Sequence, residues 1–381
     1  MKQQDFTEFT VTACVNQPDH WWGDDEKRHI CEDNVLTIGM LNEINDFDVE
    51  VIDRSSRGRG WDKKNFGVGW ARKTAMDQVA GKANDNDLIL CLDGDTVFNK
   101  NYLGSVAKSF ENNPGIVALA IPYYHKLTGN TEEDRSILRY EIYMRHYLLN
   151  LFRIESPYSF TAIGSAMAAP VRAYRKVGGI TPFKSGEDFY FMQKMAKNGQ
   201  VGTWNREPVF PAARFSSRVF FGTGPAMIRG NAGDWSGYPV YSPESFDRVA
   251  QAYSEFPHLF EKNVPTPMDD FLSGKFGEED IWQPLRNNFK QRDQFVKACM
   301  KKIDALRVLQ FLKATHKEGR DEENLRDYLE KNHPEELRLQ GIDLEGFTFA
   351  KSSVEELDKI RNLLFSLETE QRKRTPVVGI Y

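Results

Sequence analysis

The sequence predicts an α/β protein with a mostly parallel sheet, helices on both faces of that sheet, and a mainly helical region after it. Strand-like and helix-like segments alternate over roughly the first 125 residues. The strand-like segments are apolar throughout, which is typical of strands that are buried on both faces. After about residue 245 charged residues dominate, apolar residues recur every three or four positions, and strand signals nearly vanish. That change predicts the helical region.

The first predicted helix lies between the first two predicted strands in the sequence. FTVTACV, at 9–15, is an apolar run typical of a buried strand, and FDVEVID, at 47–53, alternates with period two. Between them, apolar residues recur at near-helical spacing, at Val35, Ile38, Leu41 and Ile44. In the next predicted helix, 69–80, Ala71, Ala75 and Val79 form a narrow face suited to close packing on a sheet.

The alternation continues and then becomes less regular. A strand at 87–92, a helix at 102–110 and a strand at 115–122 complete the first half. The middle of the chain predicts further elements: a helix at 134–152, a small-residue segment at 164–170, a helix at 187–199 that ends at Gly199, and strands at 200–204 and 208–215.

Composition excludes several classes of protein. A net charge of −5 over 381 residues does not indicate a nucleic-acid-binding protein. No apolar run is long enough for a membrane span, and the first ten residues lack the apolar run of a signal peptide. The cysteines show no zinc or disulfide spacing, at positions Cys14, Cys31, Cys91 and Cys299. We therefore expect a reduced cytoplasmic protein.

Two carboxylates stand one residue apart at the end of the strand in LILCLDGDTVF, residues 88–98. In an extended segment Asp93 and Asp95 project to the same side, and Gly94 lets a ligand approach the backbone. Ligands of open α/β sheets bind beyond the carboxyl ends of the strands. Mg²⁺ and Mn²⁺ are typically held by one or two carboxylates together with phosphate oxygens. The pair therefore indicates half of a metal–diphosphate site, and an acidic turn after a strand is the alternative.

Four segments in order resemble glycosyltransferase family 2 enzymes, which have the Rossmann-like GT-A fold. They are VIDRSS at 51–56, NFGVGWAR at 65–72, NDLILCLDGDTVF at 86–98 and VGGITPFKSGEDFYFMQKMAKNGQV at 177–201. The resemblance covers about residues 9–230. It implies a GT-A domain over 1–244, with a donor half at about 9–125 and an acceptor half at about 126–244. A helical extension, 245–381, would follow.

On the donor side the resemblance assigns four residues. Asp53 matches the aspartate that binds the nucleotide base, and Arg72 matches an arginine near the base and diphosphate. Asp93 would lie near the ribose and the metal, and Asp95 would bind the metal directly. Arg54 stands where many members have a second acidic residue, so the choice between uracil and guanine stays open.

On the acceptor side Glu187 and Asp188 match the family's Glu-Asp pair, whose aspartate is the expected general base. A carboxylate at hydrogen-bond distance can take the proton of the attacking hydroxyl. Alternatively, both are first-turn residues that complement the helix dipole. Arg218, in RFSSRVFFGTG at 214–224, lies where members carry a loop over the donor, and it could bind the departing diphosphate through a forked contact.

The resemblance implies inverting transfer of a glycosyl group from a UDP- or GDP-sugar to an acceptor hydroxyl, with Mn²⁺ or Mg²⁺ as cofactor. The acceptor would be a saccharide or a lipid-linked molecule, in polysaccharide or glycoconjugate synthesis. One rival class is a sugar-1-phosphate nucleotidyltransferase, but the glycine-rich loop expected after the first strand is missing from CVNQPDHWW, 14–22. The other rival is a scaffold that binds nucleotide-sugars without catalysis.

Two further features permit more than one interpretation. Trp21 and Trp22 either form an acceptor platform or pin their loop to the core. The C-terminal helices would pack against the catalytic domain, hold the acceptor, mediate dimerisation, or contact a membrane surface peripherally. The membrane alternative depends on basic residues that flank an apolar face, namely Lys301, Lys302, Arg307 and Lys313.

Overall fold

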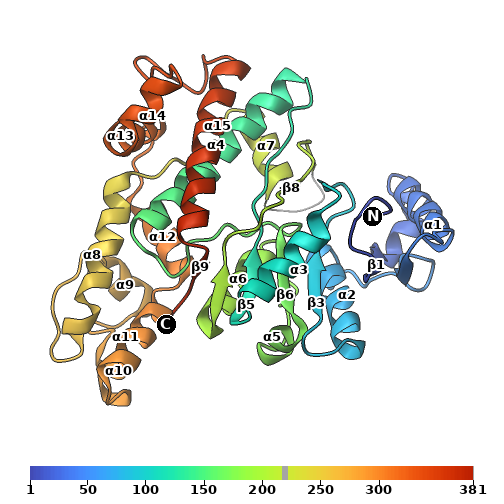
Figure 1. Ribbon diagram of the computed structural model, residues 1–381, viewed down its shortest axis with the longest axis horizontal. Coiled ribbons are helices and arrows are strands. Elements are labelled where there is room, and N and C mark those ends of the chain that lie inside the picture. Colours follow the sequence, from blue (N-terminus) through green and yellow to red (C-terminus); the bar gives the residue numbers. More distant parts are fainter. Residues whose placement is uncertain (217–221, 381) are drawn as a thin grey trace. The chain divides into compact units, whose positions relative to one another are not determined.

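A computed structural model of the chain describes residues 1–216 and 222–380 (Figure 1). The chain forms two compact units. The first consists of Met1–Lys126, Ala162–Met195 and Trp204–Pro225, and the second of Leu127–Thr161, Ala196–Thr203 and Ala226–Tyr381. The predicted α/β class with a helical C-terminal region is confirmed.

The division into units differs from the boundary predicted at residue 244. The second unit takes in Leu127–Thr161, which the sequence analysis assigned to the acceptor half. The reason is a shared core. Leu138 and Ile142 belong to the same buried apolar cluster as Leu357 and Leu364, more than two hundred residues further along the chain. Local sequence patterns do not reveal such distant partners.

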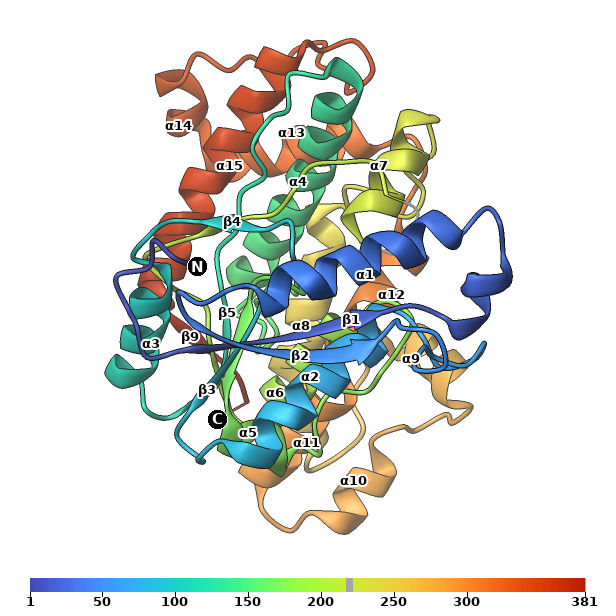
Figure 2. The ribbon, with the colours of Figure 1, turned by 90° about the vertical axis from the view of Figure 1, so that its right-hand side faces the viewer.

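In the first unit, strands β1 (Thr10–Asn16) and β2 (Asp48–Arg54) pair in parallel, with Val11 opposite Val49. Helices α1 (Arg28–Asn42) and α2 (Val68–Lys82) flank this pair (Figure 2). A short 3₁₀ turn, Asp19–Gly23, precedes α1. The helix lies where predicted, but Val35 on its expected apolar face is 47% exposed.

The other strands of this unit are more mixed in direction than the alternation predicts. Strand β6 (Met167–Pro170) lies between β3 (Leu88–Cys91) and β5 (Ile116–Ala120), antiparallel to both. A strand–helix–strand pattern predicts that the two strands are parallel only where the helix returns the chain to the end of the sheet at which the first strand began. Before β6 the chain runs through a long helix and an irregular stretch, so the pattern does not determine its direction.

A separate two-stranded sheet follows the paired aspartates in the chain. Strand β4 (Val97–Phe98) pairs antiparallel with β8 (Val209–Phe210). The strand predicted at 208–215 is limited to two residues, because Pro208 and Pro211 flank it and have no backbone N–H to donate. Three helices complete the unit: α3 (Tyr102–Asn112), α5 (Val171–Lys176) and most of α6 (Glu187–Asn198).

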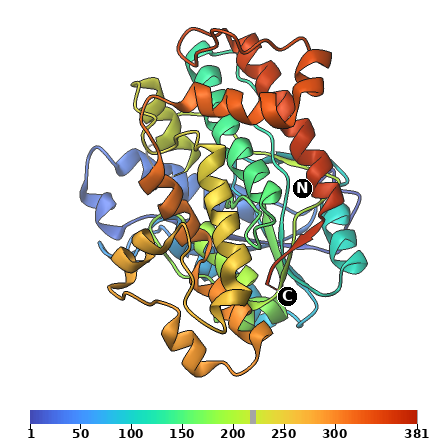
Figure 3. The same ribbon diagram turned by 90° about the vertical axis from the view of Figure 1, so that its left-hand side faces the viewer.

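The second unit is mainly helical. Its longest helices, α4 (Thr131–Arg153) and α15 (Val354–Arg374), lie side by side, and α8 (Pro243–Leu259) also packs against α4 (Figure 3). The remaining elements are β7 (Gln200–Gly202), α7 (Thr223–Asn231), α9 (Asp269–Phe276), α10 (Gln283–Asn288), α11 (Arg292–Lys302), α12 (Ala305–Thr315), α13 (Asp321–Asn332), α14 (Pro334–Leu339) and β9 (Val377–Val378). Within residues 1–216 and 222–380, none of the helices has the length and apolar character needed to cross a membrane.

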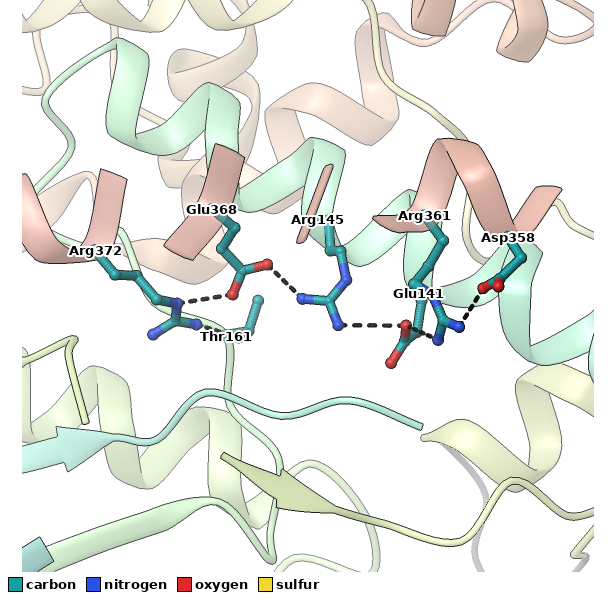
Figure 4. A network of polar contacts seen from close by, with 7 residues as sticks. All are labelled: Glu141, Arg145, Thr161, Asp358, Arg361, Glu368 and Arg372. Carbon is teal, nitrogen blue, oxygen red and sulfur yellow. Dashed lines mark hydrogen bonds and ion pairs between the residues drawn. The ribbon is translucent and has the colours of Figure 1, made fainter. Parts of the chain in front are cut away.

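A chain of buried charges joins α4 to α15 (Figure 4). Arg145 of α4 donates to Glu368 at 2.7 Å, and Glu368 also accepts from Arg372 at 2.7 Å. Arg361 of α15 donates to Glu141 of α4 at 2.9 Å. These side chains are at most 1% exposed. Because a buried charge is costly unless it is paired, the alternating charges favour one register of the two helices.

Candidate active site

The paired aspartates lie in a turn between β3 and β4. The backbone N–H of Thr96 donates to the carbonyl of Asp93 at 3.0 Å and closes the turn. The segment is therefore bent rather than extended as the sequence analysis assumed, and Gly94 lies at its exposed tip. The side chain of Asp93 is 46% exposed and that of Asp95 34% exposed. Each carboxylate is held by a different arginine.

Arg72 lies in the second turn of α2 and joins the two predicted halves of the site. Its guanidinium donates to Asp93 at 2.7 Å and forms an ion pair with Glu187 at the start of α6. The Arg72 side chain is only 8% exposed. Burial alone would lower the pKa of Arg72, but the charges of Asp93 and Glu187 outweigh it, so the pKa is raised. The arginine therefore stays charged between the two carboxylates.

Two glycines make room for this arrangement, and the sequence analysis did not identify their roles. A Cβ at Gly69 would lie 1.9 Å from the carbonyl oxygen of Phe183, so only glycine lets α2 approach the segment before α6. A Cβ at Gly164 would lie 2.4 Å from Nη2 of Arg72. Gly164 opens the small-residue segment that leads into β6, and that composition was the one signal in the sequence for a close approach.

The Glu-Asp pair begins α6, as predicted. Glu187 is 3% exposed, and burial raises its pKa to about 7 although Arg72 acts to lower it. Burial also raises the pKa of Asp188, again against the effect of Arg72. The Asp188 carboxylate accepts a hydrogen bond from the backbone N–H of Phe189 at 2.7 Å. Both carboxyl groups are therefore easier to protonate than ordinary surface carboxylates.

Asp53 lies at the end of β2 and organises the turn that follows. One carboxylate oxygen accepts from the N–H groups of Ser55, at 3.0 Å, and Ser56, at 2.9 Å. The other faces the guanidinium of Arg59 at 3.3 Å. Burial acts to raise the pKa of Asp53, but the hydrogen bonds from Ser56 and Ser55 lower it to about 2. Asp53 is thus a turn-capping residue in this structure, and a base-binding role would use its second oxygen.

Trp22 is attached to the same turn. Its indole Nε1–H donates to the carbonyl of Ser55 at 2.9 Å, and the Arg57 guanidinium lies over its ring, 5.8 Å from the ring centroid. This hydrogen bond ties the segment after β1 to the segment after β2. The interpretation of Trp22 as a residue that pins its loop has direct support from this contact.

Arg214 forms the second contact to the paired aspartates. Its Nη2 lies 2.5 Å from Oδ2 of Asp95. The antiparallel pairing of β4 with β8 explains the contact, because the residues before Val97 and after Phe210 leave the ladder at the same end. Arg218, which the sequence predicts to contact the diphosphate, lies outside the described residues. Arg214 begins the same segment and was overlooked, because no spacing rule separates two arginines in one loop.

The carboxylates of Asp93 and Asp95 could hold a divalent cation if a bound ligand supplied the rest of its coordination shell. Among residues 1–216 and 222–380, no group of three or more histidine, cysteine, aspartate and glutamate side chains could hold a metal by itself. Mg²⁺ usually binds through one or two carboxylates, water and substrate phosphates. Asp93 and Asp95 supply such hard oxygen donors, and both are partly open to solvent.

Comparisons with known proteins bear on the family. The model of the family described as Glycosyl transferase family 2 matches residues 10–178. This range contains Asp53, Arg72, Asp93 and Asp95 and ends before the Glu-Asp pair. A comparison with curated proteins gave no match.

Among solved structures, the chain is similar to one described as the crystal structure of S. aureus TarS. The identity is 14% and the TM-score 0.35, over 84% of this chain and 52% of that one. The chain thus spans about half the length of that protein, and a likeness at this level bears on neither activity nor substrate. The family match covers three of the four segments on which the resemblance was drawn, those at 51–56, 65–72 and 86–98. Residues 10–178 of this chain are thus similar to glycosyltransferase family 2, whose model matches them.

Proposed function

We propose that the protein transfers a glycosyl group from a UDP- or GDP-sugar to an acceptor hydroxyl, with inversion at the anomeric carbon. The observation that carries this proposal is the contact of Arg72 with both Asp93 and Glu187. It unites the turn expected to meet the donor diphosphate with the pair expected to meet the acceptor. A donor and an acceptor must lie within a few ångströms of each other for direct transfer.

In this mechanism Asp188 takes the proton of the attacking hydroxyl. Glu187 is engaged by the Arg72 guanidinium, whereas Asp188 accepts a hydrogen bond from a backbone N–H. A raised pKa brings a carboxylate closer to the pH at which it must both accept and release a proton. Attack from the side of Asp188 with departure of the diphosphate on the opposite side inverts the anomeric centre.

Asp93 and Asp95 would hold Mn²⁺ or Mg²⁺, which would stabilise the negative charge of the departing diphosphate. Asp53 and Arg72 would orient the nucleotide on the donor side. Arg218 retains its proposed contact with the diphosphate as a hypothesis. The acceptor would be a saccharide or lipid-linked hydroxyl of polysaccharide or glycoconjugate synthesis, and the reaction would take place in the cytoplasm or at a membrane surface.

A donor panel tests the proposal. The protein is incubated with UDP- and GDP-sugars and Mn²⁺, and released nucleoside diphosphate is measured with and without added saccharides. We expect slow hydrolysis of at least one donor, and its loss in Asp188→Asn with nucleotide binding retained. Binding without turnover by the wild-type protein would favour a non-catalytic scaffold. Full turnover by Asp188→Asn would refute the assignment of the base.

A further inference from the structure

The two arginines that contact the paired aspartates differ in how firmly they are held. Arg72 is 8% exposed and has two carboxylate partners, Asp93 and Glu187. Arg214 is 48% exposed, and its ion pair is with Asp95, which is itself 34% exposed. A half-exposed ion pair contributes little to stability, whereas a buried arginine between two carboxylates is costly to move. The pair of Arg214 with Asp95 is therefore the one that a ligand can open.

The backbone around Arg214 also permits a change of partner. Residues 211–216 belong to no helix or strand, so the side chain can be redirected without breaking a ladder hydrogen bond. Asp95 lies two residues before β4 and Arg214 four residues after β8, and arginine has the longer side chain. The arginine is therefore the more adaptable member of the pair.

A divalent cation at Asp95 would compete with Arg214. The guanidinium lies 2.5 Å from Oδ2 of Asp95, and a metal ion bound to that oxygen would repel it. Displaced from Asp95, the guanidinium would stay within reach of a diphosphate bound at the same turn. Its planar fork matches phosphate oxygens.

We propose that Arg214 is a donor-binding residue that exchanges partners. It pairs with Asp95 until a divalent cation takes that carboxylate, and it then contacts the diphosphate of the donor. The inference rests on the proposed function, because it needs a nucleoside diphosphate and a cation at this turn. It assigns to Arg214 two opposite effects: competition with the metal and attraction of the nucleotide.

The experiment measures these two effects separately on the full chain. Binding of Mn²⁺ alone is followed by the loss of its free-ion electron paramagnetic resonance signal, and binding of UDP and of GDP at saturating Mn²⁺ is followed by calorimetry. In Arg214→Gln we expect Mn²⁺ alone to bind more tightly, by up to about fivefold, the range for half-exposed ion pairs. We expect the nucleotide to bind at least about tenfold more weakly, the range for a charge-assisted hydrogen bond to phosphate.

Two further variants separate the effect of the forked guanidinium of Arg214 from the effect of its positive charge. Arg206→Gln is the matched control, since Arg206 is an exposed arginine before β8, at the other end of the ladder, and we expect it to change neither affinity. Arg214→Lys keeps the positive charge but loses the fork, so we expect near wild-type Mn²⁺ affinity and weaker nucleotide binding.

Several results would overturn the inference. Weaker or unchanged Mn²⁺ binding in Arg214→Gln would show that the arginine does not compete with the metal. Unchanged nucleotide binding would show that it does not contact the diphosphate, and equal effects in Arg206→Gln would reduce both to net charge. If the wild-type protein binds neither UDP nor GDP with Mn²⁺, the proposed function itself fails. The inference about Arg214 fails by itself if the wild-type protein binds nucleotide and Arg214→Gln binds it equally well.

Discussion

Replacing Gly164 by alanine tests whether the position of Arg72 matters for catalysis. The added Cβ would lie 2.4 Å from Nη2 and 2.7 Å from Cζ of Arg72. Ordinary contacts between such atoms begin near 3.4 Å, so the guanidinium must move by about 1 Å. That shift disturbs its contacts with Asp93 and Glu187 together.

The magnitude follows from this displacement. Misplacement by about 1 Å in an active site can cost on the order of 100-fold in rate, or about 2.7 kcal/mol in transition-state free energy. Stability should also fall, because the displaced guanidinium is buried and contacts both Asp93 and Glu187. Thermal unfolding therefore has to be measured beside the rate, at a temperature where the variant is folded.

The assay is kcat/KM for donor turnover in Gly164→Ala, measured alongside thermal unfolding. Gly81→Ala is the matched control, because a Cβ at Gly81 in α2 meets nothing within 4 Å, and we expect it to retain wild-type turnover. Wild-type kcat/KM in a folded Gly164→Ala protein would refute the reasoning. So would a loss of turnover that Gly81→Ala reproduces.

Two other predictions concern stability. The pKa of Glu187 is about 7 in the folded protein, against 4.5 for an ordinary glutamate. Between these two pH values the folded state binds more protons than the unfolded state. The free energy of unfolding should therefore fall as pH rises from about 4.5 to 7. Glu187→Gln mimics the protonated side chain, and chemical denaturation at several pH values should show it gaining stability over the wild type across that interval; a constant difference would contradict the assignment. Glu368→Ala removes the buried carboxylate that Arg145 and Arg372 share and should lower the free energy of unfolding by about 3–5 kcal/mol, as loss of one member of a buried pair does. Glu370→Ala in the same helix removes an exposed pair and should cost much less, and equal losses in the two variants would contradict the role of burial.

Much of the first unit could be predicted because its signals are local. Apolar runs predicted the strands near residues 10 and 88, and a period-two alternation predicted the strand near residue 48. The Asp-Gly-Asp turn follows the strand near residue 88, as expected from its sequence. The direction of β6 could not be predicted, because it depends on a long connection. The short length of β8 was visible in its flanking prolines, but the predicted strand ran past them.

The contacts of the candidate site also include some that local sequence predicts and some that only the three-dimensional structure reveals. The carboxylates at 93, 95, 187 and 188 were chosen because they match motifs of the resembled family, and the roles assigned to them stay predictions. The contact of Arg214 with Asp95 depends on a ladder between segments more than one hundred residues apart, and the role of Gly164 depends on an atom of Arg72. The union of α4 with α15 is equally remote in sequence. Such contacts are decided by packing in three dimensions, and one sequence contains no local mark of them.

The most direct test of the proposed donor site is a crystal structure of the protein with Mn²⁺ and the nucleoside diphosphate that it binds, recorded with anomalous scattering from manganese. We predict a manganese peak next to Asp95 that joins the carboxylate to the diphosphate. A nucleotide bound elsewhere, or bound at the turn without a manganese peak, would contradict the proposed donor site.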